Sequence, residues 1–313
     1  MNRIIGTYEG EEKGPLFICF GAMHGNEPAG VKALETIFRM LEIEPLRNPT
    51  FKFKGRMVGM IGNLRAYKEG KRFIEKDLNR QWKSENMKRI LNSRPDHLSP
   101  EEVEIQETLF IIKKEIQEYQ PDEMVVLDLH TTSAFGGIFT IVNDDPDSLE
   151  IGSQLHAPVI KGMIRGLSGT TLHFFHDDNF PVMTTAVTFE SGQHQEPQAV
   201  NRAIAAIVNC LRSIGCVDAD DVENIHDQML LDYSKNLPKI TELIYTYAIE
   251  ENEEFELFKG FRNFDSIEKG QVLGKNQHGD IVAKEAGLML MPLYQKQGED
   301  GFFLVKDLSL IHI

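Results

Sequence analysis

Three apolar runs in the first two-thirds of the chain constrain its fold more than any other feature. They are Leu16 to Phe20, Met124 to Leu129, which only Asp128 interrupts, and the shorter stretch Ala186 to Phe189. A strand covered on one face alternates apolar and polar residues, whereas a strand of a parallel sheet, covered on both faces, is apolar along its length. The runs therefore predict a mostly parallel, mixed sheet flanked by helices.

Two helices are predicted beside these strands. Ser99 supplies an N-cap, Pro100 suits the first helical position, and Glu102 completes a capping box. An apolar stripe at spacings of three and four residues follows, formed by Ile105, Leu109, Ile112, Ile116 and Tyr119. A second helix is predicted from about residue 195 to 213, stopping at Gly215. Strands that alternate with helices indicate an α/β fold.

The character of the chain changes after about residue 217. Residues 218–236 are acidic and polar and predict one bridging helix, and short strand-like segments between glycines follow from Lys239 onward. A chain of 313 residues exceeds the usual size of a single core. We therefore predict a catalytic α/β domain over residues 1–220, and a linker helix with a small β-rich C-terminal domain over residues 221–313.

The charge balance restricts the partners. With 33 Lys and Arg against 48 Asp and Glu, the net charge of -15 disfavours nucleic acid and anionic membranes, so a small molecule is the expected partner. The three cysteines have no CxxC spacing. The N-terminus shows no signal sequence, and no apolar run of about 18 residues occurs in the chain. A cytoplasmic protein is expected.

His24, Glu27 and His130 form the candidate metal site. His24 and Glu27 follow the first apolar run, His130 ends the second, and Glu190 ends the third. In open α/β sheets, ligands bind beyond the carboxyl ends of the strands, so these side chains should meet at one edge. Two imidazoles and one carboxylate suit Zn²⁺ and leave a fourth coordination position open, as in catalytic zinc sites. We predict one zinc ion per chain.

Other interpretations remain open at this stage. A competing group of metal-ligand types lies at His173, His176, Asp177 and Asp178, although a polar loop is the simpler interpretation. Asp128 shares a strand face with His130 and either orients that ligand or is satisfied by backbone donors. Trp82 is expected to pack in the core rather than to line a substrate site.

Four short motifs occur in an order that resembles the succinylglutamate desuccinylase/aspartoacylase family, which has a zinc carboxypeptidase-like fold. They are His24-Gly25-Asn26-Glu27, Asp77-Leu78-Asn79-Arg80, Asp128-Leu129-His130-Thr131-Thr132-Ser133 and Phe189-Glu190-Ser191-Gly192. The resemblance spans most of the first 215 residues, and the β-rich tail resembles the C-terminal domain of the same family. It implies hydrolysis of the amide bond of an N-acyl amino acid.

The resemblance also implies roles for single residues. His24, Glu27 and His130 match the zinc ligands, and Glu190 matches the carboxylate that acts as general base and then general acid. The pair Asn79 and Arg80 matches residues that bind a substrate carboxylate. Arg65 corresponds to an arginine that stabilises the oxyanion of the reacting carbonyl.

The substrate stays open within this resemblance. An N-acetyl or N-succinyl group on an acidic amino acid is expected, although the aspartoacylase arginine before the catalytic Glu is missing and Arg165 is the nearest alternative. Lys71 and Arg72 look like a desuccinylase segment but are expected in a solvated loop, and Tyr294 is a candidate contact by proximity. A zinc carboxypeptidase and a non-catalytic metal-binding protein are the alternatives, and the resemblance is compatible with a homodimer.

Overall fold

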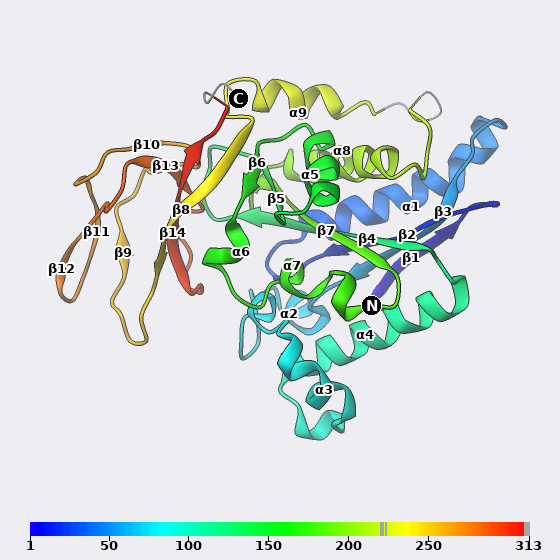
Figure 1. Cartoon of the computed structure of the whole chain (residues 1–313), viewed down its shortest axis with the longest axis horizontal. Helices are drawn as coiled ribbons and strands as arrows, with labels where there is room; N and C mark the ends of the chain where they lie inside the picture. The colour runs from blue at the N-terminus through cyan, green and yellow to red at the C-terminus, as the bar shows by residue number, and fades with distance from the viewer. Residues whose placement is uncertain (220–221, 223, 310–313) are drawn as a thin grey trace.

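The computed structural model describes residues 1–219, 222 and 224–309, and its main element is an eleven-stranded mixed sheet (Figure 1). Its strands, in spatial order, are β1 (Ile4–Glu9), β3 (Lys54–Ile61), β2 (Glu12–Gly21), β4 (Glu123–Thr132), β7 (Met183–Gln193), β5 (Phe139–Val142), β6 (Val159–Lys161), β8 (Ile240–Ala248), β14 (Asp300–Asp307), β13 (Gly287–Leu290) and β10 (Ser266–Ile267). The strands β3, β2, β4 and β7 are parallel neighbours at its centre. This confirms the predicted α/β architecture.

Helices cover both faces of the central strands. On one face lie α1 (Ala29–Arg47) and α8 (Ala199–Ser213), and on the other lies α4 (Pro100–Tyr119) with α3 (Ser84–Asn92) beyond it (Figure 1). Phe17 and Cys19 of β2 pack in the core on the side of α1 and α8, while Ile18 and Phe20 pack in the core on the side of α4. Both sides of the strand are therefore buried, which explains the unbroken apolar run.

The remaining helices are short or peripheral. They are α2 (Leu64–Glu69), α5 (Pro146–Gln154), α6 (Met163–Gly166), α7 (Thr171–Phe174), α9 (Asp227–Ser234) and the 3-10 turns η1 (Leu78–Arg80), η2 (Pro95–His97) and η3 (Asp177–Asn179). The helix α9 falls where a bridging helix is predicted. In the part of the chain that the structure describes, no helix is long and apolar enough to cross a bilayer.

The C-terminal β region extends the main sheet. Strand β8 pairs in parallel with β6, and β14, β13 and β10 follow it as antiparallel neighbours. A second sheet of β12 (Gly279–Val282), β11 (Val272–Asn276) and β9 (Glu256–Leu257) lies beside these strands, and a separate small core includes Leu273, Phe302 and Leu304. The boundary predicted between residues 220 and 221 lies outside the described residues.

The helix α4 begins with a hydrogen-bonded N-cap. Ser99 accepts a hydrogen bond from the Glu102 backbone N–H, and the Glu102 side chain accepts one from the Ser99 backbone, so the predicted capping box is present. We expect Ser99→Ala to lower the free energy of unfolding by about 1 kcal/mol, because an N–H of the first turn loses its partner. Urea unfolding followed by circular dichroism measures this.

The matched control is Ser153→Ala on the exposed side of α5, where no cap is lost. If both variants were equally stable, the capping box would contribute nothing measurable.

Candidate active site

Three neighbouring strands deliver polar side chains to one edge of the sheet. His24 and Glu27 lie in the turn between β2 and α1, and His130 near the end of β4 pairs in register with Glu190 of β7. Gly25 is required in that turn, because an added Cβ would lie 2.2 Å from the backbone carbon of Ala66. The predicted metal ligands and Glu190 all line one cavity.

The Glu27 carboxylate joins the two histidines. Its Oε1 lies 2.9 Å from His24 Nδ1, and its Oε2 lies 3.1 Å from His130 Nδ1 and accepts a hydrogen bond of 2.9 Å from the Thr131 backbone N–H. All three side chains are buried, and one ligand atom from each lies within 4.8 Å of the others. This group could hold a metal ion, and its donor types fit zinc.

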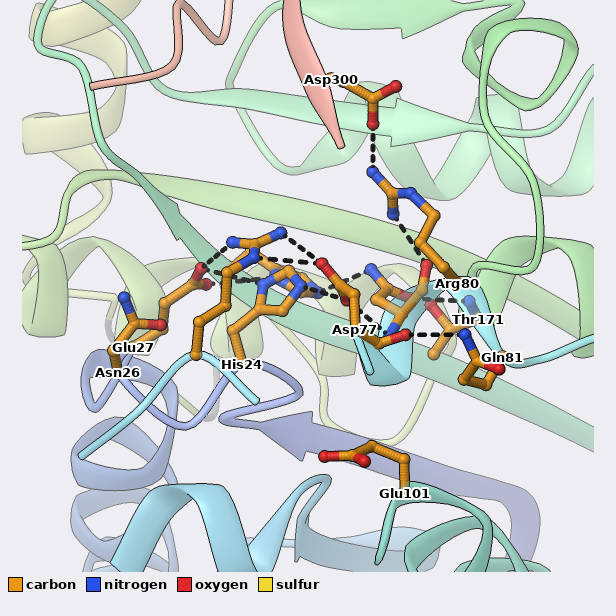
Figure 2. Close-up of polar contacts among 12 residues, drawn as sticks. His24, Asn26, Glu27, Asp77, Arg80, Gln81, Glu101, Thr171 and Asp300 are labelled. Atoms are coloured by element: carbon orange, nitrogen blue, oxygen red, sulfur yellow. Dashed lines mark hydrogen bonds and ion pairs between the residues drawn. The ribbon is translucent and has the colours of Figure 1, made fainter. Parts of the chain in front are cut away.

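A second layer of carboxylates orients the imidazoles. Asp77 lies 3.0 Å from His24 Nε2 (Figure 2), and Asp128 lies 3.0 Å from His130 Nε2. Metal-binding histidines commonly contact a carboxylate through the nitrogen that does not face the metal, because this fixes the ring and raises its basicity. The structure therefore favours the orienting interpretation of Asp128 and adds Asp77, which the sequence analysis did not single out.

These contacts shift the ionisation of the whole group. Burial disfavours charge on Glu27, but His24 and His130 outweigh it and hold the pKa of Glu27 well below its usual value. Burial also disfavours the charged form of His130, yet Asp128 and Glu27 hold its pKa well above the usual value. The site is thus built to keep positive charge between its carboxylates.

Glu190 is the carboxyl group without a fixed partner. It is buried, and its Oε2 has no hydrogen-bond partner among the described residues. Burial raises the pKa of Glu190 to about 8, against the opposing charge of His130 and with the carboxylates of Glu27 and Asp128 adding to the effect. Such a perturbed acid in a cavity is typical of a proton-transfer group.

Arg72, rather than Arg65, lies beside Glu27 of the candidate metal site. The Arg72 guanidinium donates to Asp77 Oδ2 at 2.9 and 3.1 Å and lies 3.6 Å from Glu27 Oε1, whereas Arg65 is exposed on α2 and does not line the cavity. The backbone carbonyl of Arg72 accepts a hydrogen bond from Gly25. The expectation of a solvated loop holds for Lys71, which is exposed and pairs with Glu69, and is wrong for Arg72.

Asn79 and Arg80 line the same cavity. The Asn79 side chain lies 3.5 Å from His130 Nε2 and accepts a hydrogen bond from the Thr171 backbone N–H. Arg80 instead extends toward the C-terminal region, where its Nη2 lies 2.5 Å from Asp300 Oδ2 (Figure 2). The structure therefore brings the predicted substrate-binding pair to the cavity and gives Arg80 a partner that the sequence did not indicate.

Two acidic side chains of α4 bind the backbone on either side of Arg72 in the sequence. The buried Glu101 accepts hydrogen bonds from the backbone N–H groups of residues 74, 75 and 76, and Glu104 accepts from those of Leu64 and Arg65. Backbone donors without another partner are satisfied in this way. The capped helix thus fixes the loops that follow β3.

The remaining sequence candidates lie elsewhere. In the competing metal group His176 is half-buried and Asp178 is exposed, and among the described residues only His24, Glu27 and His130 bring three ligand atoms close enough to share an ion. Arg165 is exposed and pairs with Asp144 and Glu242. The Tyr294 hydroxyl donates to the Phe258 carbonyl and does not line the cavity, and Trp82 is buried against Phe174 and Phe175.

Metal analysis can separate the two candidate groups. We expect His24→Ala and His130→Ala to abolish stoichiometric retention of zinc after gel filtration, because each removes one of three ligands. His176→Ala is the control and should retain zinc as the unmodified protein does. Loss of zinc from the control, with retention in the other two variants, would place the metal in the competing cluster.

Comparisons with solved structures show proteins of the same fold. A solved ectoine utilization protein, EutE (DoeB) from Ruegeria pomeroyi, has a TM-score of 0.64 at 17% identity over 96% of this chain and 87% of its own. Succinylglutamate desuccinylase from Vibrio cholerae also gives a TM-score of 0.64, at 18% identity over 95% and 82%. These similarities show the shared fold.

Sequence similarity points to the same group of enzymes. A protein of Nostoc sp. (strain PCC 7120) described as a probable aspartoacylase is 22% identical over 88% of both chains. The model of the succinylglutamate desuccinylase/aspartoacylase catalytic domain matches residues 13–214, which is more than half of the chain. The chain therefore belongs to the succinylglutamate desuccinylase/aspartoacylase family of acyl-amino-acid hydrolases.

Proposed function

We propose that this protein is a zinc-dependent amidohydrolase that cleaves the amide bond of an N-acyl amino acid. The observation that carries the proposal is the position of Glu190, a buried carboxyl with a free oxygen, in the cavity that the His24, Glu27 and His130 group also lines. Zinc held by these three residues would supply Lewis-acid activation of water and of the scissile carbonyl. The family assignment supports this class of reaction.

Glu190 is the proton-transfer residue in this proposal. Its pKa of about 8 lies near neutrality, where a group both accepts and returns a proton efficiently. A cation bound beside it would favour the ionised form, which is the form that accepts a proton from the attacking water. The proton then passes to the departing amine of the amino acid.

Arg72 takes the role that the sequence analysis gave to Arg65. Its guanidinium is held by Asp77 within 3.6 Å of Glu27, so its charge lies beside the reacting centre. A fixed cation at that place stabilises the negative charge that develops on the carbonyl oxygen. Asn79 and Arg80 bind the amino-acid carboxylate and so select which amide faces Glu190.

Both an acetyl and a succinyl group stay within this proposal as the acyl part. The three cysteines are buried free thiols, which supports the predicted cytoplasmic location.

Hydrolysis of peptide C-termini is the remaining enzymatic alternative, and release of amino acids from a panel of short peptides would favour it.

Substitution of the proposed base tests the function directly. We expect Glu190→Gln to lower kcat against N-acetyl and N-succinyl amino acids by about 10²- to 10⁴-fold. Zinc content should stay at one per chain, because Glu190 is not among the three ligands. Amine release measures turnover, and near-native turnover by the zinc-loaded variant would contradict the assignment.

The two arginines form a matched pair for a second test. Arg72→Lys should lower kcat by about 10²-fold or more, since the guanidinium that stabilises the oxyanion and binds Asp77 is lost. Arg65→Lys, on the exposed surface of α2, should leave kcat within experimental error. The opposite ranking would restore the role predicted for Arg65.

A further inference from the structure

Strand β7 contains a β-bulge directly after Glu190. The regular register between β4 and β7 ends at the pair of His130 and Glu190. The next pair joins Thr132 to Gln193, so β7 has one extra residue between the two pairs. Within the bulge, Gly192 has a φ of +111°, a conformation that favours glycine. Bulges redirect the side chains of a strand and are common next to active sites.

Ser191, the first residue of this bulge, is held from two sides. Its hydroxyl donates a hydrogen bond of 3.1 Å to the His130 carbonyl on β4. Its own carbonyl accepts one of 3.3 Å from Nη1 of Arg202, on the helix α8 that packs beside β7. Because Ser191 follows Glu190 directly, these two contacts fix the backbone from which the Glu190 side chain projects.

The Glu190 carboxyl depends on that backbone for its direction. Its Oε2 has no hydrogen-bond partner among the described residues, so no bond to this oxygen holds the group in place. A proton-transfer group must nevertheless lie within hydrogen-bond reach of the atoms that exchange the proton. The contacts of the bulge therefore bear on the geometry of the reaction.

Arg202 is itself held firmly against the bulge. Its Nη1 pairs with Glu196 Oε2 at 2.6 Å, its side chain is 5% exposed, and its guanidinium carbon lies 4.1 Å from the centre of the Tyr233 ring. The same Glu196 oxygen accepts a hydrogen bond of 3.0 Å from the Gln193 backbone N–H. A Cβ added to Gly192 would lie 2.4 Å from both Arg202 Nη1 and Glu196 Oε2. The ion pair thus lies directly on the bulge.

We propose that Arg202 is a positioning residue for proton transfer, because it holds the bulge that directs the Glu190 carboxyl toward the candidate metal site. This inference rests on the proposed function and gives Arg202 no contact with the substrate. Apolar residues in place of a buried ion pair often leave stability unchanged or improve it. Stability alone is therefore a weak reason for a buried arginine at this position.

Arg202→Lys tests the proposal in the zinc-loaded protein. Lysine keeps the positive charge but loses the planar guanidinium, whose Nη1 binds both Ser191 and Glu196. We expect kcat to fall about tenfold to a hundredfold, because a misplacement of about 1 Å in the reacting groups has effects of this size. KM and the zinc content should stay unchanged, since Arg202 is not among the described residues that line the cavity.

The substrate for these measurements is the N-acetyl or N-succinyl amino acid that the unmodified protein hydrolyses fastest. Arg56→Lys is the matched control, because Arg56 lies 3.3 Å from Glu115 in another largely buried pair, with side chains 18% and 8% exposed. Arg56 stands near the start of β3, at the end of the sheet away from the catalytic edge. Thermal unfolding should show a loss of stability in both variants, whereas kcat should fall only in Arg202→Lys.

A double-mutant cycle separates positioning from a general loss of stability. If Arg202 acts through Glu190, the combined variant of Arg202→Lys and Glu190→Gln should be no slower than Glu190→Gln alone. A merely structural role would instead slow the combined variant by the full factor seen in Arg202→Lys. Glu196→Gln, at a position 19% exposed, disturbs the same ion pair and carries the same cycle if Arg202→Lys does not fold.

The outcomes distinguish this inference from the proposed function. A kcat unchanged by Arg202→Lys, loss of its zinc, or independent effects in the cycle would overturn the inference alone, provided that Glu190→Gln is impaired. Near-native turnover by Glu190→Gln, or no turnover by the unmodified protein, would contradict the proposed function and this inference with it.

Discussion

The buried carboxylate of Glu27 is the interaction on which the active site depends. Its two oxygens reach His24 and Arg72 on one side and His130 with the Thr131 backbone on the other. A buried carboxylate that lost these partners would cost several kcal/mol. The turn after β2, the segment after α2 and the end of β4 are therefore held in one arrangement by a single desolvated charge.

The sequence predicted the centre of the molecule because that part is governed by local patterns. Apolar runs marked β2, β4 and β7, and a polar residue at or beyond each run marked the active edge. Arg72 and Asp77 were harder to place, because the segment that follows the short helix α2 is irregular and the direction of its side chains depends on distant contacts. The hydrogen bond from the Gly25 N–H to the Arg72 carbonyl, and those that Glu101 accepts from residues 74–76, fix the path of this segment. No local sequence pattern encodes these contacts.

The C-terminal region shows the same limit at a larger scale. Its short strands were predicted, but the order of their pairing was not: β14, the last strand, lies between β13, which precedes it in the sequence, and the more distant β8. That order brings Asp300 within reach of Arg80, although 220 residues separate them in the chain. A region expected to be a separate small domain thus contributes charged groups to the cavity.

The charge of the inner site also explains why its donor set suits a divalent cation. Four buried carboxyl groups surround the two imidazoles, namely those of Glu27, Asp77, Asp128 and Glu190. One arginine, Arg72, pairs with Asp77. In the protein alone, the excess of acid is met by protons, and the pKa values of His130 and Glu190 are both raised. A divalent cation between the imidazoles would replace those protons, because ligand histidines bind metals in their neutral form. The surrounding carboxylates therefore favour cation binding as well as histidine orientation.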